Sequence, residues 1–386
     1  MQKFDVVVHL AGEQILPLYM AIEQFDCDNH LVIVTERTDH IFERLRGYYR
    51  PTGKTFKKIT VAPYQLGADT VRKIKDAVHE TAGQSNVGFN LTGGTKPMFA
   101  VAFAACQQIK GTPFYIETSG KTVDYLAGDF GREKLTPSLT IEACVKLAGH
   151  TVRDSGRWED ITNLGTKRSL LPWLWKNRSA VSAVYKEIAP FTDNPGTPFH
   201  CTRNRYGKRV EVELNRAGTG RMTIDGETRN LGEFPDLATF VCGGWLELYC
   251  YQTLIPLRNA GQLKDMRVGF IPGWDSATVD RDAQEFDLVC TDGYTLTIAE
   301  CKAGFVKQEH LQKLENNVLH YGGAFGRGVL LSAFPFTRNS GAMRRIQSSS
   351  CLSAVAGSSL EYELQRRILE AKPGVVYSSR SGKKRR

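Results

Sequence analysis

The chain has 386 residues, of which 41% are hydrophobic and 24% charged, as is typical of a globular protein of two or three domains. No run of about 18 apolar residues and no signal peptide is recognised, which argues against a membrane-spanning helix and predicts a cytoplasmic protein. Nine scattered cysteines without a CxxC pair argue against a disulfide framework or a structural zinc site. The net charge of +9 suits an acidic partner such as nucleic acid.

The first part of the chain alternates strand-like and helix-like segments. Strands are predicted at 4–10, 31–35, 56–62, 87–91, 113–117 and 122–126 from their apolar, β-branched runs. Helices are predicted at 14–25, 39–49, 69–80 and 97–109. This alternation predicts an α/β domain over residues 1–135 with a doubly wound parallel sheet, whose ligands bind at the carboxyl ends of the strands.

The remainder of the chain predicts a connector and a second α/β unit. Residues 136–199 are less regular and are expected to be a mostly helical connector. Residues 200–372 are expected to form the second unit, which opens with a hairpin whose turn contains Gly218 and Gly220. Its other predicted elements are a helix at 244–257, strands near 267–271, 285–291 and 294–301, a helix at 308–320 and a strand at 328–332. The basic stretch 373–386 is expected to be a disordered tail.

An Asp-Gly dipeptide at 292–293 is the strongest hairpin signal in the chain. With these two residues as the loop, Asp287 would lie opposite Ile298, and Glu285 would lie opposite Glu300. Directly paired residues share a face and side chains alternate along a strand. Glu285, Asp287, Glu300 and Lys302 are therefore expected on one face, with Asp287 and Glu300 as diagonal neighbours.

Three carboxylates on one face of an apolar hairpin repel one another and resist burial. Mg²⁺ or Mn²⁺ between them would remove this repulsion and would keep positions for water and phosphate. Lys302 would then orient or deprotonate a water, or stabilise charge on the phosphate. The alternative is a surface hairpin with an ordinary ion pair between Glu300 and Lys302.

A glycine-rich turn, LTGGTK at 91–96, follows a predicted strand and precedes a helix. Gly93 and Gly94 permit positive φ and close approach of the backbone to a ligand, and the first N–H groups of the helix attract phosphate. Thr92, Thr95 and Lys96 add hydroxyl groups and a cation. The spacing is neither that of a Walker A loop nor GxGxxG. An anionic, nucleotide-like ligand is favoured, and the alternative is a tight turn that needs its glycines only for backbone reasons.

The stretches EFDLV (285–289) and TIAECK (297–302) resemble the PD-(D/E)XK nuclease family, which has a restriction-endonuclease-like fold. The resemblance implies a metal site with Asp287, Glu300 and the backbone carbonyl of Cys301 as ligands, and with Lys302 as a catalytic residue. Members often add an acidic residue from the preceding helix. Glu247 occupies the matching position, and its alternative is an ordinary helix-face glutamate.

The LTGGTK turn resembles the CARF domain, a Rossmann-like sensor of cyclic oligoadenylates in type III CRISPR systems. The resemblance implies ligand binding by the residues of this turn and, in the loops after the first two strands, by Gly12, Gln14, Thr35 and Arg37. A CARF domain followed by a PD-(D/E)XK domain resembles the ancillary nucleases that cyclic oligoadenylates activate. It implies a homodimer with one ring, expected to be cyclic tetra-adenylate, across two CARF domains, and cleavage of DNA, single-stranded RNA or both.

Three alternatives remain open at this stage. The protein could be a nuclease gated by a different nucleotide, or a nucleotide-responsive nucleic-acid-binding protein with an inactive nuclease fold. It could also be a ring nuclease that degrades its own ligand in the CARF crevice. A HEPN ribonuclease, the other common partner of CARF domains, is disfavoured because no convincing Arg-x4-6-His motif is found.

Overall fold

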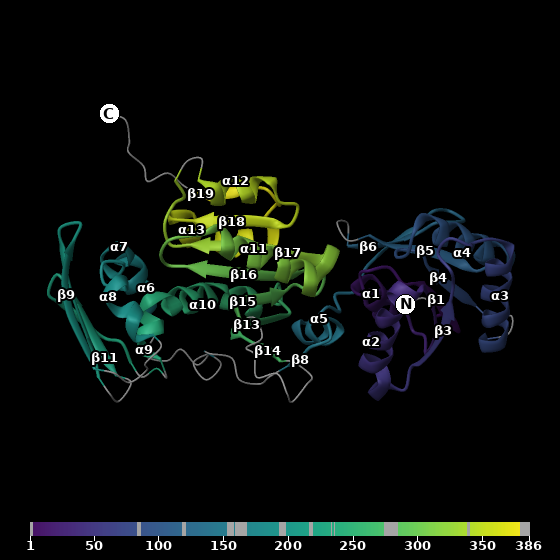
Figure 1. The fold of residues 1–386 in the computed structure, drawn as a ribbon, viewed down its shortest axis with the longest axis horizontal. Coiled ribbons are helices and arrows are strands. Elements are labelled where there is room, and N and C mark those ends of the chain that lie inside the picture. The colour runs from purple at the N-terminus through teal and green to yellow at the C-terminus, as the bar shows by residue number, and fades with distance from the viewer. Residues whose placement is uncertain are drawn as a thin grey trace.

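The computed structural model describes residues 3–82, 86–117, 121–152, 158, 168–192, 198–215, 219–232, 234, 236–273, 285–337 and 340–378. They form an elongated molecule with an N-terminal α/β domain at one end, a second α/β domain in the middle and a four-stranded sheet at the other end (Figure 1). Within these ranges, no helix has the length and apolar character needed to cross a membrane.

The N-terminal domain is built on a seven-stranded sheet of order β3-β2-β1-β4-β5-β6-β7, in which β1 to β5 are parallel. Its strands are β1 (Val6–Leu10), β2 (Asn29–Val34), β3 (Thr55–Thr60), β4 (Val87–Asn90), β5 (Thr112–Glu117), β6 (Thr122–Tyr125) and β7 (Arg132–Lys134). The helices are α1 (Leu16–Gln24), α2 (Asp39–Tyr49), α3 (Ala68–Ala82) and α4 (Lys96–Gln108), with short turns η1 (Glu36–Thr38) and η2 (Arg50–Thr52). Val7 packs in the core that contains α1 and α2, whereas Val6 and Val8 pack in the core that contains α3 and α4. The sheet is therefore covered on both faces, as predicted.

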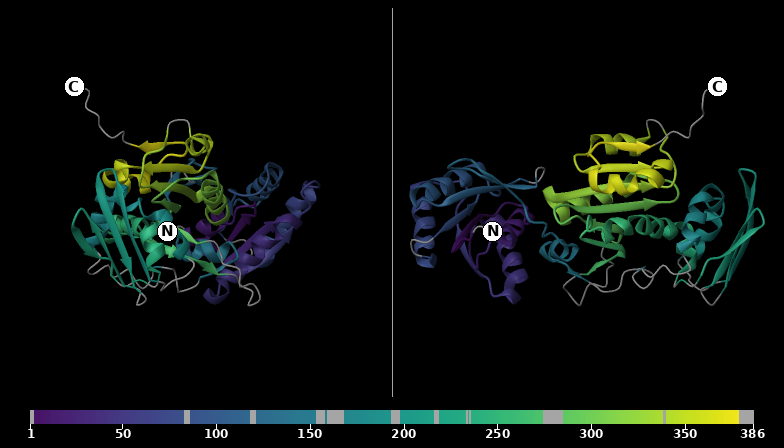
Figure 2. Two further views of the ribbon diagram at one scale, coloured as in Figure 1. Left: turned by 60° about the vertical axis from the view of Figure 1, so that its left-hand side comes forward. Right: turned by 180° about the vertical axis from the view of Figure 1, so that it is seen from behind.

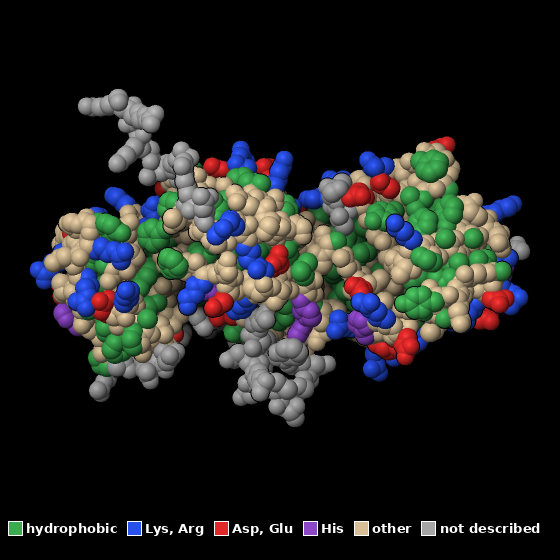
Figure 3. All heavy atoms as spheres, turned by 45° about the horizontal axis from the view of Figure 1, so that its top comes forward, with side chains coloured by type: hydrophobic (Ala, Val, Ile, Leu, Met, Phe, Trp, Pro, Cys, Tyr) green, Lys and Arg blue, Asp and Glu red, His purple; other side chains and the backbone are tan. Residues whose placement is uncertain are grey.

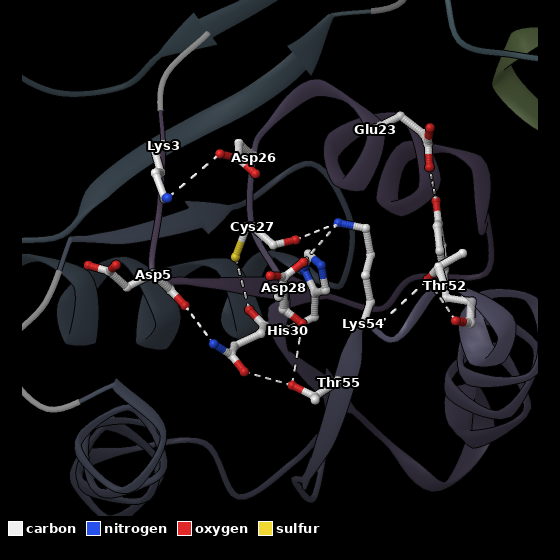
Figure 4. Close-up of polar contacts among 12 residues, drawn as sticks. Lys3, Asp5, Glu23, Asp26, Cys27, Asp28, His30, Thr52, Lys54 and Thr55 are labelled. Carbon is white, nitrogen blue, oxygen red and sulfur yellow. Dashed lines mark hydrogen bonds and ion pairs between the residues drawn. The ribbon is translucent and has the colours of Figure 1, made fainter.

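Polar contacts between loops close the amino-terminal edge of this sheet (Figure 4). Lys54 Nζ donates a hydrogen bond to the carbonyl oxygen of Cys27 at 2.5 Å, and Thr55 Oγ1 donates to Asn29 Oδ1 at 2.7 Å. Lys3 lies 3.8 Å from Asp26 on the same edge. The opposite edge, where β1, β2 and β4 end, remains the place where folds of this kind bind ligands.

The connecting region contains α5 (Ile141–Leu147), α6 (Leu170–Lys176), α7 (Arg178–Val181), α8 (Tyr185–Ile188) and η5 (Ala189–Phe191). It also contains β8 (Thr151–Val152), which pairs with β14 (Pro272–Gly273) from the second domain. A four-stranded sheet follows, with β9 (Phe199–Arg205), β10 (Lys208–Leu214), β11 (Gly220–Ile224) and β12 (Glu227–Asn230). The predicted hairpin corresponds to β10 and β11, with Leu214 opposite Gly220, while Gly218 lies outside the described residues.

The second domain is built on a six-stranded sheet of order β13-β15-β16-β17-β18-β19. Its strands are β13 (Asp265–Phe270), β15 (Phe286–Thr291), β16 (Leu296–Lys302), β17 (Gly326–Ser332), β18 (Leu352–Ala356) and β19 (Val376–Ser378). Its helices are α9 (Leu237–Thr239), α10 (Trp245–Asn259), α11 (Gln308–Asn317), α12 (Gly341–Ser348) and α13 (Ser358–Glu370), with shorter segments η6 (Phe240–Gly244), η7 (Val318–Gly322) and η8 (Gly323–Phe325). The cores on its two faces contain α10 and α11, respectively.

The predicted register of the β15–β16 hairpin is wrong by two residues. Thr291 pairs with Leu296 and Leu288 pairs with Ala299, so the loop has the four residues 292–295 rather than two. Asp292 Oδ1 accepts hydrogen bonds from the backbone N–H groups of Tyr294 and Thr295, which stabilises the wider turn. A shift of two keeps every side chain on its predicted face. One pair beyond Leu288 and Ala299, Asp287 lies directly opposite Glu300 rather than diagonal to it.

The predicted start of the disordered tail at residue 373 is also wrong. Residues 376–378 form β19, which pairs in parallel with β18 and completes the sheet. The Arg367 guanidinium lies 3.9 Å from the ring centroid of Tyr377, so the strand is packed against α13. Residues 379–386 lie outside the described part of the chain.

Candidate active site

Asp287, Glu300 and Lys302 meet at the end of the β15–β16 hairpin that is far from its turn. Lys302 Nζ lies 2.5 Å from Glu300 Oε1 and 3.5 Å from Asp287 Oδ2. Asp287 Oδ2 also accepts a hydrogen bond from the backbone N–H of Cys301 at 2.7 Å. The hairpin therefore brings together two carboxylates and one ammonium group, as expected from the alternation of side chains along the two strands.

Glu247 is buried near the start of α10, where Trp158 Nε1 donates a hydrogen bond to its Oε2 at 2.7 Å. The neighbouring Gly244 leaves room for this indole, because a β-carbon there would lie 2.4 Å from Trp158 Cζ2. Sequence reasoning missed Trp158. The sequence around it has no regular pattern, and a lone tryptophan gives no signal of its partner.

The site carries more negative than positive charge. Burial, followed by the charge of Asp287, raises the pKa of Glu247 well above its usual range, and Glu285 adds to the effect. Burial and Asp287 also raise the pKa of Glu300. Burial lowers the pKa of Lys302, but the carboxylates of Asp287 and Glu300 outweigh it, and the net shift is upward. Lys302 is therefore held in its charged form.

The donor atoms at the site suit a hard divalent cation. Mg²⁺ and Mn²⁺ prefer carboxylate and carbonyl oxygens, which Glu247, Asp287, Glu300 and the Cys301 backbone supply. Within the described ranges, no group of three or more His, Cys, Asp or Glu side chains is already gathered as a metal site. Lys302 contacts both Asp287 and Glu300 instead. Burial and then the charge of Asp287 raise the pKa of Glu247, so additional positive charge here would stabilise its ionised form.

The glycine-rich turn packs backbone to backbone against the loop after β1. A β-carbon on Gly93 would lie 2.1 Å from the carbonyl oxygen of Leu10, and one on Gly12 would lie 3.0 Å from the amide nitrogen of Gly94. Gly94 has φ of +75°, in the left-handed region that favours glycine. Thr92 Oγ1 donates to Asn90 Oδ1 and accepts from the backbone N–H of Ile116. These contacts give Thr92, Gly93 and Gly12 a structural role in shaping the edge.

The other residues predicted to bind a nucleotide differ in exposure. Thr95 caps α4 by accepting a hydrogen bond from the N–H of Met98, and Lys96 is exposed beside it. Arg37 is exposed and forms an ion pair with Glu13. Thr35 is buried in a turn, where its backbone N–H donates to Thr38 Oγ1 at 3.0 Å.

Gln14 faces the second domain. Its side-chain oxygen accepts a hydrogen bond from the backbone N–H of Ala324, next to β17, at 3.1 Å. Gln14 therefore joins the predicted ligand edge to the sheet that carries the candidate active site.

Comparison with known proteins supports this two-domain description. Residues 236–371 match the family model of the Card1-like endonuclease domain. Among curated protein sequences no match was found.

Three solved structures are similar over almost the whole chain. Can2 from Sulfobacillus thermosulfidooxidans, in complex with cyclic tetra-adenylate, is 19% identical with a TM-score of 0.73, over 95% of this chain and 100% of that one. Protein VC1899 from Vibrio cholerae is 14% identical with a TM-score of 0.74, over 95% and 97% of the two chains. A type III CRISPR defence DNA nuclease activated by cyclic oligoadenylate is 17% identical with a TM-score of 0.58, over 99% of this chain and 51% of that one.

These likenesses establish the fold. The chain has an N-terminal Rossmann-like domain and a C-terminal endonuclease-type domain, arranged as in Can2. The α/β fold class and the resemblance of the second domain to an endonuclease are therefore confirmed.

Proposed function

We propose that this protein is a metal-dependent endonuclease of type III CRISPR defence that a cyclic oligoadenylate activates. The observation that carries the proposal is the cluster of Asp287, Glu300 and Lys302, with Glu247 buried nearby, inside the domain that matches a Card1-like endonuclease.

In this proposal Glu247, Asp287, Glu300 and the carbonyl of Cys301 hold Mn²⁺ or Mg²⁺. When bound, the metal would lower the pKa of a water molecule and polarise the phosphate under attack. Lys302, kept charged by the two carboxylates beside it, would stabilise negative charge on that phosphate. Trp158 would hold the Glu247 carboxylate in position through its N–H group.

We propose that the activator binds at the carboxyl edge of the N-terminal sheet. The exposed Thr95 and Lys96 at the start of α4, together with Gly94, would meet its phosphates, and Gly12, Gln14, Thr35 and Arg37 would complete the crevice. Cyclic tetra-adenylate is the first choice, since Can2 was solved in complex with it. A ring with twofold symmetry suits a homodimer in which two such edges face each other.

The test is a cleavage assay with the full-length protein, labelled single-stranded RNA and supercoiled plasmid, with Mn²⁺, Mg²⁺ or EDTA, and with or without cyclic tetra-adenylate. We expect cutting that needs both metal and activator, and a loss of about a hundredfold or more in Lys302→Ala and Asp287→Ala. Lys372→Ala, a change at an exposed lysine of the same domain, serves as the control.

Each part of the proposal can fail separately. If both site variants cut as fast as the parent, the assigned site is wrong. Absence of cleavage by the parent under every condition would favour a binding protein with an inactive nuclease fold. Cleavage by a protein that shows no binding of cyclic oligoadenylates in calorimetry would indicate that a different nucleotide controls the nuclease.

A further inference from the structure

A groove of about 1100 Å³ lies beside the candidate active site, between the ends of β16 and β17, the α7–α8 region and the turn that joins β9 to β10. Gly304, two residues after Lys302, lines it, and so does Ser332, the partner of Lys302 in the β16–β17 register. Figure 3 shows hydrophobic side chains between the left-hand and central lobes, with Lys and Arg side chains on either side. The groove therefore lies next to the strand end that carries Lys302.

Two aromatic side chains from separate elements project at this groove. Phe305 is 87% exposed and Tyr206 is 73% exposed, and both line the groove. Tyr206 lies in the β9–β10 turn with φ of +52°, an uncommon conformation for a bulky residue, followed by Gly207 at +75°. Both rings bury little surface within the chain, which leaves them available to another molecule.

The charge around the groove is positive. Lys186, Arg205 and Lys307 line it. The acidic lining residue Glu187 is paired with Arg203 at 2.6 Å, so its charge is compensated. The Arg205 guanidinium lies 5.1 Å from the Tyr206 ring centroid, which joins a cation to one of the exposed rings. Exposed aromatic rings alternating with cations are the features by which proteins hold unpaired nucleotides.

We propose that this groove binds a single-stranded stretch of the nucleic-acid substrate, with Phe305 and Tyr206 stacking on bases and Lys186, Arg205 and Lys307 meeting phosphates. This inference rests on the proposed nuclease function and names its substrate class. In a duplex the bases stack on one another and their faces are covered, so the two rings would have no surface to contact. DNA and RNA strands both offer the required base faces and phosphates.

The test is fluorescence anisotropy with the full-length protein in EDTA, which allows binding without cleavage. The probes are short labelled oligo(dT) and oligo(U), the same oligo(dT) with abasic sites, and a matched DNA duplex, each with and without cyclic tetra-adenylate. The variants are Phe305→Ala, Tyr206→Ala and the conservative Phe305→Trp. The control is Tyr362→Ala, which removes a ring of 79% exposure on α13, away from the groove.

We expect each alanine variant to bind the single strands about tenfold more weakly, with no change in thermal stability. Phe305→Trp and Tyr362→Ala should bind like the parent, and the parent should bind the abasic oligomer as weakly as Phe305→Ala binds the intact one. The inference is overturned if both alanine variants bind single strands as tightly as the parent. It is also overturned if they lose as much affinity for the duplex as for the single strands. Because no chemistry is measured, this failure is distinct from loss of cleavage in Lys302→Ala, which tests the proposed function.

Discussion

At the level of single residues, the buried carboxylate of Glu247 accepts a hydrogen bond from the indole N–H of Trp158. A buried carboxylate close to Asp287 has a strong tendency to take up a proton, and its pKa is raised accordingly. The indole N–H of Trp158 opposes this tendency, since a hydrogen bond to the charged form favours that form. Trp158 therefore keeps Glu247 better suited to bind a cation.

Trp158→Phe removes this N–H group and retains most of the ring. We expect the concentration of Mn²⁺ needed for cleavage, and for a metal-induced rise in melting temperature, to increase about tenfold. Trp175→Phe is a matched control, because Trp175 Nε1 donates to Glu361 at 3.0 Å, away from the candidate active site. Equal metal responses in the two variants would contradict the role given to Trp158.

The sequence predicts the positions of residues that follow a strand or helix pattern. It does not predict contacts between residues that are far apart in the chain. Asp287, Glu300 and Lys302 follow from the alternation of side chains in two strands. Trp158 lies 89 positions before the residue it contacts, and no local pattern marks it. Gln14 was expected at a ligand, but its side chain also contacts Ala324, a long-range contact that the sequence does not reveal.

At the level of elements, α10 begins where two consecutive glycines have different surroundings. A β-carbon on Gly244 would lie within 3.0 Å of two ring atoms of the buried Trp158, whereas nothing lies within 4 Å of the corresponding position on Gly243. The close packing of η6 and α10 on the Trp158 ring therefore requires glycine at 244 only.

We predict that Gly244→Ala lowers the free energy of unfolding by about 1–3 kcal/mol, because overpacking a core displaces its side chains. Gly243→Ala should be tolerated. Chemical denaturation of the two variants and the parent measures the difference. An equally stable Gly244→Ala protein would show that the indole can move without cost.

The hairpin shows why an element can be predicted with its details wrong. The Asp-Gly pair correctly marked the turn, but the Asp292 side chain accepts two backbone N–H groups and widens the loop to four residues. Each side chain stays on its predicted face of the hairpin because the register shift is an even number of residues. Elements α12, β18, α13 and β19 were not predicted individually, since they complete the sheet through long-range pairing.

At the level of the whole molecule, the turn of the hairpin is attached to the N-terminal part of the chain. Lys121 Nζ lies 2.6 Å from Asp292 Oδ2 and 4.7 Å from the ring centroid of Tyr294. The N–H of Leu139 donates to the carbonyl of Gly293 at 2.9 Å. The hydrogen bond between Gln14 and Ala324 adds a second link, from the predicted ligand edge to η8, next to the sheet of the candidate active site.

Gln14→Ala tests whether this second link restrains the nuclease. Because the bond joins the two domains, we expect its loss to raise cleavage in the absence of activator and to lower the activation ratio. The affinity for cyclic tetra-adenylate should change less. Calorimetry and cleavage rates on one preparation separate the two effects. A variant with weaker ligand binding and unchanged basal cleavage would mean that Gln14 acts only in recognition.

A pair of histidines at the same junction predicts a dependence of stability on pH. His150 Nε2 lies 3.0 Å from His320 Nε2. Burial and the neighbouring His320 lower the pKa of His150, and burial and Arg44 lower that of His320. As the pH falls through about 6.5, these two histidines take up protons in the unfolded chain but remain neutral in the folded chain. The free energy of unfolding therefore decreases as the pH drops through this range.

We expect the melting temperature of the parent to fall between about pH 7.5 and about pH 5.5, on either side of the usual histidine pKa. His320→Gln, which carries no charge at either pH, should show a smaller fall. The buried His9 and His30 remain in both proteins, so their contribution cancels in the comparison. An identical fall in parent and variant would contradict the prediction.

The docked turn has a consequence for protein engineering. The turn of the β15–β16 hairpin contacts Lys121, Leu139 and Pro137, and a β-carbon on Gly293 would lie 2.6 Å from Pro137 Cβ. A chimera that replaces the N-terminal domain would have to preserve these contacts, or place Gly293 and its neighbours against a new surface of matching shape. Exchange of the N-terminal domain is thus limited by the contacts of this turn, together with the hydrogen bond between Gln14 and Ala324.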